Sequence, residues 1–543
     1  MPPVSPESQA QLAAYDAQPY HGRPCTDSHP SRMAVVAKLA GLKIPDVERC
    51  RVLEIACGDG NNLIAIAESL PGAQCLGIDL SGRHIAMGQA EIVALGLKNI
   101  TLKQADLLAI APGEATLGEF DFIIAHGFYS WVPRPVQDRL FAIARRHLAK
   151  NGALFVSYNL QPGWRLMQVL RDFLSFHVRG AATPAERLEK AIDGTRLLPL
   201  LTTGQDSDAA RFIGAYARDF ACNLENLGIW RDPVLLYDVI GDTSTPVYFS
   251  SFVNHATRFG LRYLGDAEDR GGLPRSLPVD VLPRLLASVD TPLDLQQYSD
   301  FARMRTFRQS LLCHAEVAVR PEPQLADLHG LFVSCRLEAP RDLSLISEAP
   351  ADFAYSPVIG SGPVLRTDHP LTKAALSILA ERAPSAIEFQ ALCQAASVRL
   401  GSPEAAENAD SEILAKFLLR ASAESPQALS LHTYAPAVAN SPSLLPTARG
   451  FARRQVARGD ELTTLFHDSF SVEPLCRALL PLLDGTRDVA ALTAALHSLS
   501  QTGRLALPED SAGPLGSAPD ETPLADDVRA QLAALARLGV LLS

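Results

Sequence analysis

The sequence contains no apolar run long enough to cross a membrane and no start typical of a secreted protein. Nowhere do 18 apolar residues follow one another, so we expect no transmembrane helix and no membrane insertion. The first residues, MPPVSPESQAQ, contain neither the basic segment nor the apolar stretch of a signal peptide. These two absences predict a cytoplasmic protein.

The cysteines form neither a metal-binding nor a disulfide pattern. The chain has nine of them, an odd number, and no C-x-x-C pair places two at ligand spacing. We therefore expect no metal site and no disulfide framework. Reduced, buried thiols are the simplest interpretation.

An excess of positive charge is also missing. The chain carries 49 Lys and Arg against 60 Asp and Glu, whereas a surface that binds nucleic-acid phosphates needs clustered Lys and Arg. With a net charge of −11, we expect no nucleic-acid partner. At 543 residues the chain is too long for one core, which predicts three or four domains.

Alternating β-rich and amphipathic segments between residues 51 and 159 indicate a parallel sheet with crossover helices. We predict strands at 51–57, 74–79, 100–104, 120–126 and 152–158. Between them, residues 62–70, 82–95 and 135–149 have apolar positions at helical spacing, and Gly152 is expected to end the last of these helices. The series predicts a Rossmann-like α/β domain.

The remaining chain is predicted to be mostly helical. Residues 164–230 have a helical pattern, and a helix, a glycine and a strand over 249–268 would return the chain to the edge of the sheet. Three short helices between 371 and 420, with a strand at 429–434, suit a winged-helix-like module. The predicted units are an α/β domain (1–180), a helical domain (181–315), a connector with the winged-helix-like module (316–440) and a C-terminal domain (441–543).

The segment RVLEIACGDGNN at 51–62 carries the strongest indication of a ligand site. A strand with an acidic residue, Glu54, leads into a turn where Gly58 and Gly60 leave room for a bulky cofactor to approach the backbone. The alternative is a tight strand-to-helix turn that binds nothing. A dinucleotide site would need a third glycine where Leu63 stands, so the turn favours a cofactor without phosphates.

Two further carboxylates lie at the ends of the next two predicted strands. Asp79 closes the second strand, where a carboxylate can accept hydrogen bonds from both ribose hydroxyls. Asp106, with Leu107 beside it, follows the third strand, where it can accept from an adenine amino group; alone it would be a helix cap. Because ligands of open α/β sheets bind at the carboxyl ends of the strands, the three signals together predict an S-adenosylmethionine (AdoMet) site.

This arrangement resembles the class I AdoMet-dependent methyltransferases. The residues that match the binding motifs of this family are Glu54, Gly58, Gly60, Asp79 and Asp106. Ala56 takes the place of the family's first glycine. Since alanine tolerates any backbone with negative φ, we expect cofactor binding to be retained.

Less common residues narrow the resemblance. The segments that carry it are YDAQPY at 15–20, SHPSRMAVVAKLAG at 28–41, FDFIIAHGFYSWVP at 120–133, SYNLQPGW at 157–164, TPVYFSSFVNHATRFGLRYLGDAE at 245–268 and FRQSLLCHA at 307–315. They resemble the bacterial methyltransferases with a methyltransferase regulatory domain, whose characterised members include protein-lysine methyltransferases acting on outer-membrane proteins. The resemblance implies a Rossmann-like class I methyltransferase domain followed by mostly helical accessory domains.

Several polar and aromatic residues are candidates for the methyl acceptor's site. His126, Tyr129 and Trp131 follow the fourth predicted strand, and Tyr158 closes the fifth. We expect these four to be catalytic, although a buried structural histidine or a packed turn is the alternative for them. The aromatic rings would favour a developing methylammonium group. Tyr15, Asp16 and Tyr20 precede the sheet and are candidates for a lid over the cofactor.

Three functions remain open from the sequence. A protein methyltransferase acting on lysine comes first, because the long C-terminal half suits recognition of a protein substrate. The alternatives are a small-molecule methyltransferase, whose accessory domains cap the site or form a homodimer, and an AdoMet-binding regulator without activity. Since residues 316–543 contain no cofactor motif, a fragment of residues 1–315 should bind AdoMet nearly normally.

Overall fold

The computed structural model describes residues 21–110, 117–228, 231–241, 244–268, 277–278, 280–356, 362–401, 409–506 and 523–543. The candidate lid residues Tyr15, Asp16 and Tyr20 lie outside the described residues.

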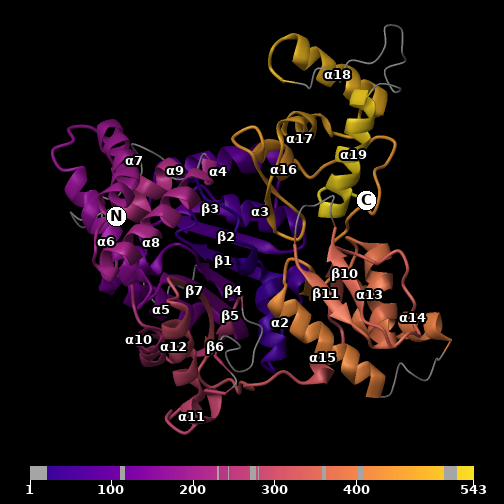
Figure 1. Ribbon diagram of the computed structural model, residues 1–543, viewed down its shortest axis with the longest axis horizontal. Helices are drawn as coiled ribbons and strands as arrows, with labels where there is room; N and C mark the ends of the chain where they lie inside the picture. Colours follow the sequence, from indigo (N-terminus) through magenta and orange to yellow (C-terminus); the bar gives the residue numbers. More distant parts are fainter. Residues whose placement is uncertain are drawn as a thin grey trace.

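A seven-stranded sheet forms the centre of the first half of the chain (Figure 1). Its order is β3-β2-β1-β4-β5-β7-β6. The strands are β1 (Arg51–Ile55), β2 (Gln74–Asp79), β3 (Ile100–Gln104), β4 (Phe120–Ala125), β5 (Leu148–Asn159), β6 (Leu261–Asp266) and β7 (Phe307–His314). The first five are parallel, whereas β7 runs antiparallel to both of its neighbours. This confirms the predicted Rossmann-like domain.

The start of β5 differs from the prediction. The preceding helix, α5 (Arg134–His147), ends at His147, and the chain continues directly into the strand, so Gly152 is not a helix stop. A Cβ at Gly152 would lie 2.6 Å from the carbonyl oxygen of Asp121. The glycine is therefore explained by the close approach of β4 to β5.

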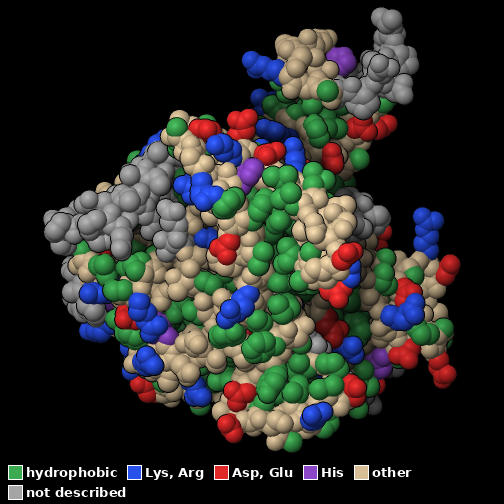
Figure 2. Space-filling model, turned by 60° about the vertical axis from the view of Figure 1, so that its left-hand side comes forward, with side chains coloured by type: hydrophobic (Ala, Val, Ile, Leu, Met, Phe, Trp, Pro, Cys, Tyr) green, Lys and Arg blue, Asp and Glu red, His purple; other side chains and the backbone are tan. Residues whose placement is uncertain are grey.

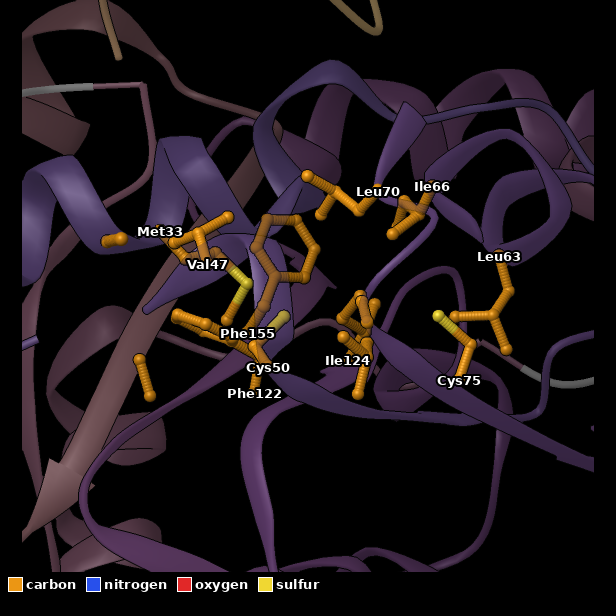
Figure 3. Packing of buried hydrophobic residues seen from close by; sticks show 14 of the residues in the cluster. Met33, Val47, Cys50, Leu63, Ile66, Leu70, Cys75, Phe122, Ile124 and Phe155 are labelled. Atoms are coloured by element: carbon orange, nitrogen blue, oxygen red, sulfur yellow. The ribbon is translucent and has the colours of Figure 1, made fainter. Parts of the chain in front are cut away.

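Helices cover both faces of the sheet. One face packs against α2 (Pro30–Leu39), α3 (Asn61–Ser69) and α4 (Gly82–Leu95), and the other packs against α5 and α10 (Phe249–Arg258). In the core of the first face, Phe122, Ile124 and Phe155 of the sheet meet Leu63 and Ile66 of α3 (Figure 3). Sheet residues therefore have apolar partners above and below, as a buried parallel sheet requires.

A helical segment interrupts the sheet after β5. It contains α6 (Trp164–His177), α7 (Pro184–Leu201), α8 (Asp208–Glu225), α9 (Arg231–Pro233) and the π-helix η5 (Val234–Val239). After it the chain returns through α10, β6, α11 (Leu282–Leu286), α12 (Pro292–Arg303) and β7. The predicted edge strand is confirmed as β6, and β7 is inserted between it and β5. The described part of the range 181–315 thus contains mainly helices together with two strands of the sheet.

A second core follows the sheet domain. Its elements are η6 (Leu325–Leu328), β8 (Phe332–Cys335), β9 (Leu337–Glu338), β10 (Ala351–Tyr355), β11 (Val364–Thr367), α13 (Pro370–Arg382), β12 (Ile387–Glu388), α14 (Phe389–Leu400), α15 (Ala409–Glu424) and β13 (Leu429–His432). The three helices and the strand predicted here are confirmed. Val35 and Leu39 of α2 pack into this core, so that helix is shared between two units.

The last unit has its own leucine-rich core beside α3 and α4 (Figure 1). It consists of α16 (Gly450–Gln455), β14 (Glu461–Thr463), β15 (Ser469–Ser471), α17 (Pro474–Leu479), η8 (Leu480–Leu482), α18 (Val489–Gln501) and α19 (Pro523–Leu538). Within the described ranges of the whole chain, no helix combines the length and apolar character needed to span a bilayer.

Candidate active site

The turn between β1 and α3 has the left-handed backbone expected of a cofactor turn. Gly58 and Gly60 have φ values of 57° and 75°. A Cβ at Gly60 would lie 2.7 Å from Cδ1 of Leu102, whereas a Cβ at Gly58 would have nothing within 4 Å. The Leu102 side chain therefore packs closely against Gly60, whereas Gly58 is open and a ligand can reach its backbone.

Ala56 corrects one expectation from the sequence. Its φ is 57°, in the left-handed region, and not the negative value assumed for it. The position has the conformation for which related chains use glycine. An alanine side chain is strained here because Cβ crowds the following carbonyl oxygen.

Asp79 links this turn to the next strand. Its Oδ2 accepts a hydrogen bond of 2.8 Å from the N–H of Gly58, and its Oδ1 accepts one of 2.8 Å from the N–H of Ser81. Burial raises the pKa of the carboxyl group, while the two N–H donors oppose that shift. Each carboxylate oxygen keeps a second lone pair, so Asp79 can still accept from ribose hydroxyls.

Glu54 has a carboxylate oxygen with no partner. The residue is buried, and Oε1 accepts a hydrogen bond of 2.8 Å from Nδ2 of Asn62. The other oxygen, Oε2, is buried and unpaired among the described residues. Burial raises the pKa of Glu54 to about 8, and the negative charges of Asp59 and Asp79 add to the shift. A positively charged group such as the ammonium of AdoMet would satisfy this oxygen.

Asp106 and Leu107 lie where β3 ends. Asp106 is half-buried, and its Oδ1 accepts a hydrogen bond of 2.9 Å from the N–H of Leu108. The carboxylate thus closes a local turn, a role similar to the helix cap that was the alternative for it. It retains acceptor capacity for an adenine amine. Leu107 is buried in the core with Ile55 and Ile78, so its side chain packs beneath the strand ends and does not face the solvent.

His126, a candidate for the acceptor's site, lies directly after β4. The next residue, Gly127, donates its N–H to Oγ of Ser157 at 2.8 Å, which keeps the loop against the end of β5. Nδ1 of His126 is buried and has no partner in the described part of the chain. Burial lowers the pKa of the imidazole to about 4, so the ring is neutral near pH 7.

The two candidate tyrosines lie inside the core. The Tyr129 hydroxyl is 2.8 Å from Nδ1 of His255, and the Tyr158 hydroxyl is 3.0 Å from Oγ of Ser310. The Tyr158 ring stacks on Phe252 with centroids 4.0 Å apart. Both side chains are fully buried. Their hydroxyls connect to α10 and to β7. Contact with an acceptor stays a prediction for them, as it does for His126 and Trp131.

Trp131 meets an aromatic residue that sequence analysis missed. The ring of Trp164, the first residue of α6, lies edge-on to it with centroids 6.3 Å apart. Nε1 of Trp164, Nδ2 of Asn159 and Oε1 of Gln161 are buried without a partner among the described residues. All three belong to the segment SYNLQPGW, whose unusual run of polar and aromatic residues directly after a strand was the available signal.

Three family models match the chain. A methyltransferase domain matches residues 52–152, a predicted methyltransferase regulatory domain matches residues 231–314, and the PKMT C-terminal winged helix domain matches residues 445–540. The winged helix therefore falls one unit later than sequence analysis placed it. No three His, Cys, Asp or Glu side chains are grouped to hold a metal ion within the described ranges.

Rickettsial proteins are similar to most of the chain. Uncharacterized protein RP028 of Rickettsia prowazekii is 31% identical over 251 residues, which are 46% of this chain and 96% of that protein. Uncharacterized protein RP789 of the same organism is 29% identical over 390 residues, 72% of this chain and 68% of that protein. The structure of PKMT2 from Rickettsia typhi in complex with AdoHcy superimposes with a TM-score of 0.79 at 24% identity, covering 97% of this chain and 100% of that chain.

The sheet order, the glycine turn and the carboxylates at three successive strand ends define a class I methyltransferase domain with AdoMet as its cofactor. The chain belongs to the family of AdoMet-dependent methyltransferases that join this domain to a methyltransferase regulatory domain and a PKMT winged helix domain.

Proposed function

We propose that this enzyme methylates the side-chain amine of lysine residues in a protein substrate. The observation that carries the proposal is a set of buried polar atoms, unpaired among the described residues, that belong to residues just after the carboxyl end of β4 and at or just after that of β5. They are His126 Nδ1, Asn159 Nδ2, Gln161 Oε1 and Trp164 Nε1. Buried polar atoms are nearly always paired, so four unpaired ones on two segments that follow neighbouring strands indicate that a ligand supplies the partners.

These atoms complement a peptide that carries a long amine side chain. Asn159 Nδ2 and Trp164 Nε1 are donors for a peptide carbonyl group, and Gln161 Oε1 is an acceptor for a peptide N–H. The Trp131 and Trp164 rings lie edge to face at 76°, and aromatic rings attract a methylammonium group. A small carboxylate substrate would instead need a cation, and none of these four groups is one near pH 7.

Glu54, Asp79 and Asp106 would hold AdoMet, which supplies a methyl group on a positively charged sulfonium. The chain must then align the lysine amine with that methyl group and keep the amine unprotonated. A free lysine has a pKa of about 10.4, and burial lowers it. His126 assists because it is neutral and can accept a hydrogen bond from the amine through Nδ1.

Exposed apolar side chains on the helices that follow β5 support a protein as the substrate. Helices α6, α7 and α8 expose five large apolar side chains, namely Val169, Phe176, Leu200, Leu201 and Phe212. The face with these helices comes forward in Figure 2, where hydrophobic areas lie between interspersed acidic and basic side chains. Exposed apolar areas of this kind are typical of protein-binding surfaces. The PKMT winged helix match and the PKMT2 fold add support for lysine as the acceptor.

A labelling experiment tests the proposal. Purified enzyme, AdoMet with a labelled methyl group and a bacterial lysate are incubated, and the products are separated by gel and analysed by mass spectrometry for methyl-lysine. We expect labelled protein bands that are absent with the Asp79→Ala variant. Label confined to the small-molecule fraction would favour a small-molecule methyltransferase. Tight AdoHcy binding with no label transferred would favour a regulator.

The location and assembly of the enzyme are further proposals. We infer a cytoplasmic protein because eight of its nine cysteines are buried as free thiols, the form that a reducing compartment maintains. A homodimer remains a proposal as well, which light scattering of the purified protein tests. We retain the four-unit division, with the winged helix assigned to the last unit.

A further inference from the structure

The C-terminal unit is packed directly on the helix that follows the cofactor turn. Arg449 is fully buried, and its Nε donates to Oε2 of Glu68 at 2.6 Å while its Nη2 donates to the carbonyl oxygen of Ala65 at 3.0 Å. The N–H of Phe451 donates to Oε1 of the same glutamate at 2.9 Å. Both acceptor residues belong to α3. The two units therefore share a buried polar interface on α3, the helix that begins at the AdoMet turn.

His467 extends this interface toward the cofactor turn. Its side chain is fully buried, and its Nε2 lies 2.9 Å from Oδ1 of Asn62. The same Oδ1 accepts a hydrogen bond of 2.9 Å from the backbone N–H of Cys25, which fixes it as the oxygen of the amide. Nε2 of His467 must then carry a proton and donate it to Asn62.

Asn62 transmits this contact to the carboxylate of the site. With its oxygen engaged by His467 and Cys25, its Nδ2 donates to Oε1 of Glu54 at 2.8 Å and to Oγ of Ser28 at 3.0 Å. Glu54 is thereby held through one oxygen, and its unpaired Oε2 is left for the cofactor. Two hydrogen bonds, through Asn62, connect a residue of the winged helix domain to Oε1 of Glu54, although 405 residues separate His467 from Asn62.

We propose that His467 is a positioning residue for AdoMet: through Asn62, the C-terminal winged helix domain fixes the orientation of the Glu54 carboxylate. The winged helix domain then contributes to cofactor binding by orienting a residue of the cofactor site. Because coupling between two binding events is reciprocal, cofactor binding must also stabilise the docked position of this domain. The inference requires only the cofactor and is independent of the acceptor's identity.

Substitution of His467 tests the inference by titration calorimetry with AdoHcy, which needs no acceptor. We expect His467→Leu to weaken AdoHcy binding about tenfold, since the Asn62 amide loses the donor that orients it. His467→Gln should restore most of the affinity because the glutamine Nε2 can replace the imidazole Nε2 as the donor. Equal loss in both variants, or no loss in either, would overturn the proposal.

Arg458→Ala serves as the matched control. Arg458 belongs to the same interface, but its ion pair is with Glu91 of α4 and does not lead to Glu54. We expect unchanged AdoHcy affinity for this variant. A loss as large as that of His467→Leu would mean that general weakening of the interface, and not the connection through Asn62, controls binding.

Hydrogen exchange of the unaltered protein provides a test that does not depend on a variant folding. The backbone N–H groups of Phe466 and His467 bond to Oγ1 and to the carbonyl oxygen of Thr464, respectively. We expect saturating AdoHcy to slow exchange at these two amides severalfold. Exchange at these amides that AdoHcy does not change would contradict the coupling of cofactor binding to domain docking.

Discussion

The Tyr129 hydroxyl donates a hydrogen bond of 2.8 Å to Nδ1 of His255, and Nε2 of the same ring donates one of 2.7 Å to Oδ1 of Asp138. His255 belongs to α10, within the part of the chain that the regulatory domain model matches. Tyr129 begins the 3-10 helix η3 (Tyr129–Trp131), which ends with Trp131. The part of the chain that matches the regulatory domain therefore contacts the helix of Trp131, whereas the winged helix domain contacts Asn62 at the start of α3.

Removing the Tyr129 hydroxyl should affect methyl transfer without affecting cofactor binding. Tyr129→Phe leaves Nδ1 of His255 buried and unpaired, so we expect it to lower the free energy of unfolding by about 1–3 kcal/mol. AdoHcy affinity should stay unchanged. Methyl transfer to the lysate substrate should fall, because the 3-10 helix that carries Trp131 is held less firmly. Urea unfolding, calorimetry and the labelling assay measure the three quantities. A parallel loss of AdoHcy affinity would contradict the assignment.

The strained alanine offers a stabilising substitution. Ala56→Gly should raise the free energy of unfolding by about 1 kcal/mol, because glycine adopts a φ of 57° without a Cβ clash. Gly58→Ala is the control with the opposite sign, since it places a Cβ at the same φ. The midpoint of urea unfolding of the methyltransferase domain reports both. Destabilisation by Ala56→Gly would mean that the Ala56 methyl group makes packing contacts worth more than the strain.

Asp79 should serve both the fold and the ligand. Asp79→Ala removes the acceptor of the Gly58 and Ser81 N–H groups, so we expect a loss of about 1–3 kcal/mol in stability together with most of the AdoMet affinity. From the sequence alone we expect the residue to serve the ligand more than the core. Calorimetric titration at a temperature where the variant is folded separates the two effects. Unchanged AdoHcy affinity would remove Asp79 from the cofactor site.

The titration of Glu54 gives cofactor binding a dependence on pH. Its pKa is raised to about 8 in the folded protein, so its contribution to stability is full below the ordinary pKa near 4.5 and is lost as the pH rises through 8. An ammonium group beside Oε2 favours the ionised form. AdoHcy binding at pH 7 should therefore release a proton, and calorimetry in buffers of different ionisation enthalpy measures it.

Glu54→Gln is the control for that measurement, because a glutamine cannot titrate. Asp79 also has a raised pKa and remains in the variant, so only the part of the proton release that disappears belongs to Glu54. Stability of the variant should vary less between pH 5 and 8 than that of the unaltered protein. Identical proton release by both proteins would assign the effect to another group.

The fragment of residues 1–315 should fail to bind AdoMet normally, contrary to what the motifs alone suggest. It lacks Arg449 and His467, and it exposes the apolar side chains of Val35 and Leu39 that pack into the second core. We expect an aggregation-prone fragment whose AdoHcy affinity is reduced at least tenfold. Calorimetry on any soluble fraction tests this expectation. Full affinity in a soluble fragment would show that the cofactor turn is held without the C-terminal half.

Local signals in the sequence predicted much of the fold. The strands β1 to β4 and the helices α3 and α4 lie within one or two residues of their predicted bounds, because each has a complete apolar pattern and a glycine or a cap at its end. Tyr129 and Tyr158 were expected to be catalytic, with a packed turn as the alternative, and their side chains lie in the core. Tyrosine suits either place, and the choice depends on partners such as His255 and Ser310 that are more than 100 residues away. The contact between Asn62 and His467 has no local signal at all.

The position of β7 between β5 and β6 affects how the chain is made. On the ribosome, β5 is complete once Asn159 has been added, but its free edge gains a partner only when His314 has followed. At bacterial rates of synthesis these 155 residues take roughly 8–30 s. During that time the nascent chain presents an apolar strand with unpaired backbone groups, the feature by which strands from different chains associate. The helices α6 to α8 are synthesised in this interval. Because a lower rate of initiation leaves fewer nascent chains to associate, we expect the best yield of this enzyme under that condition.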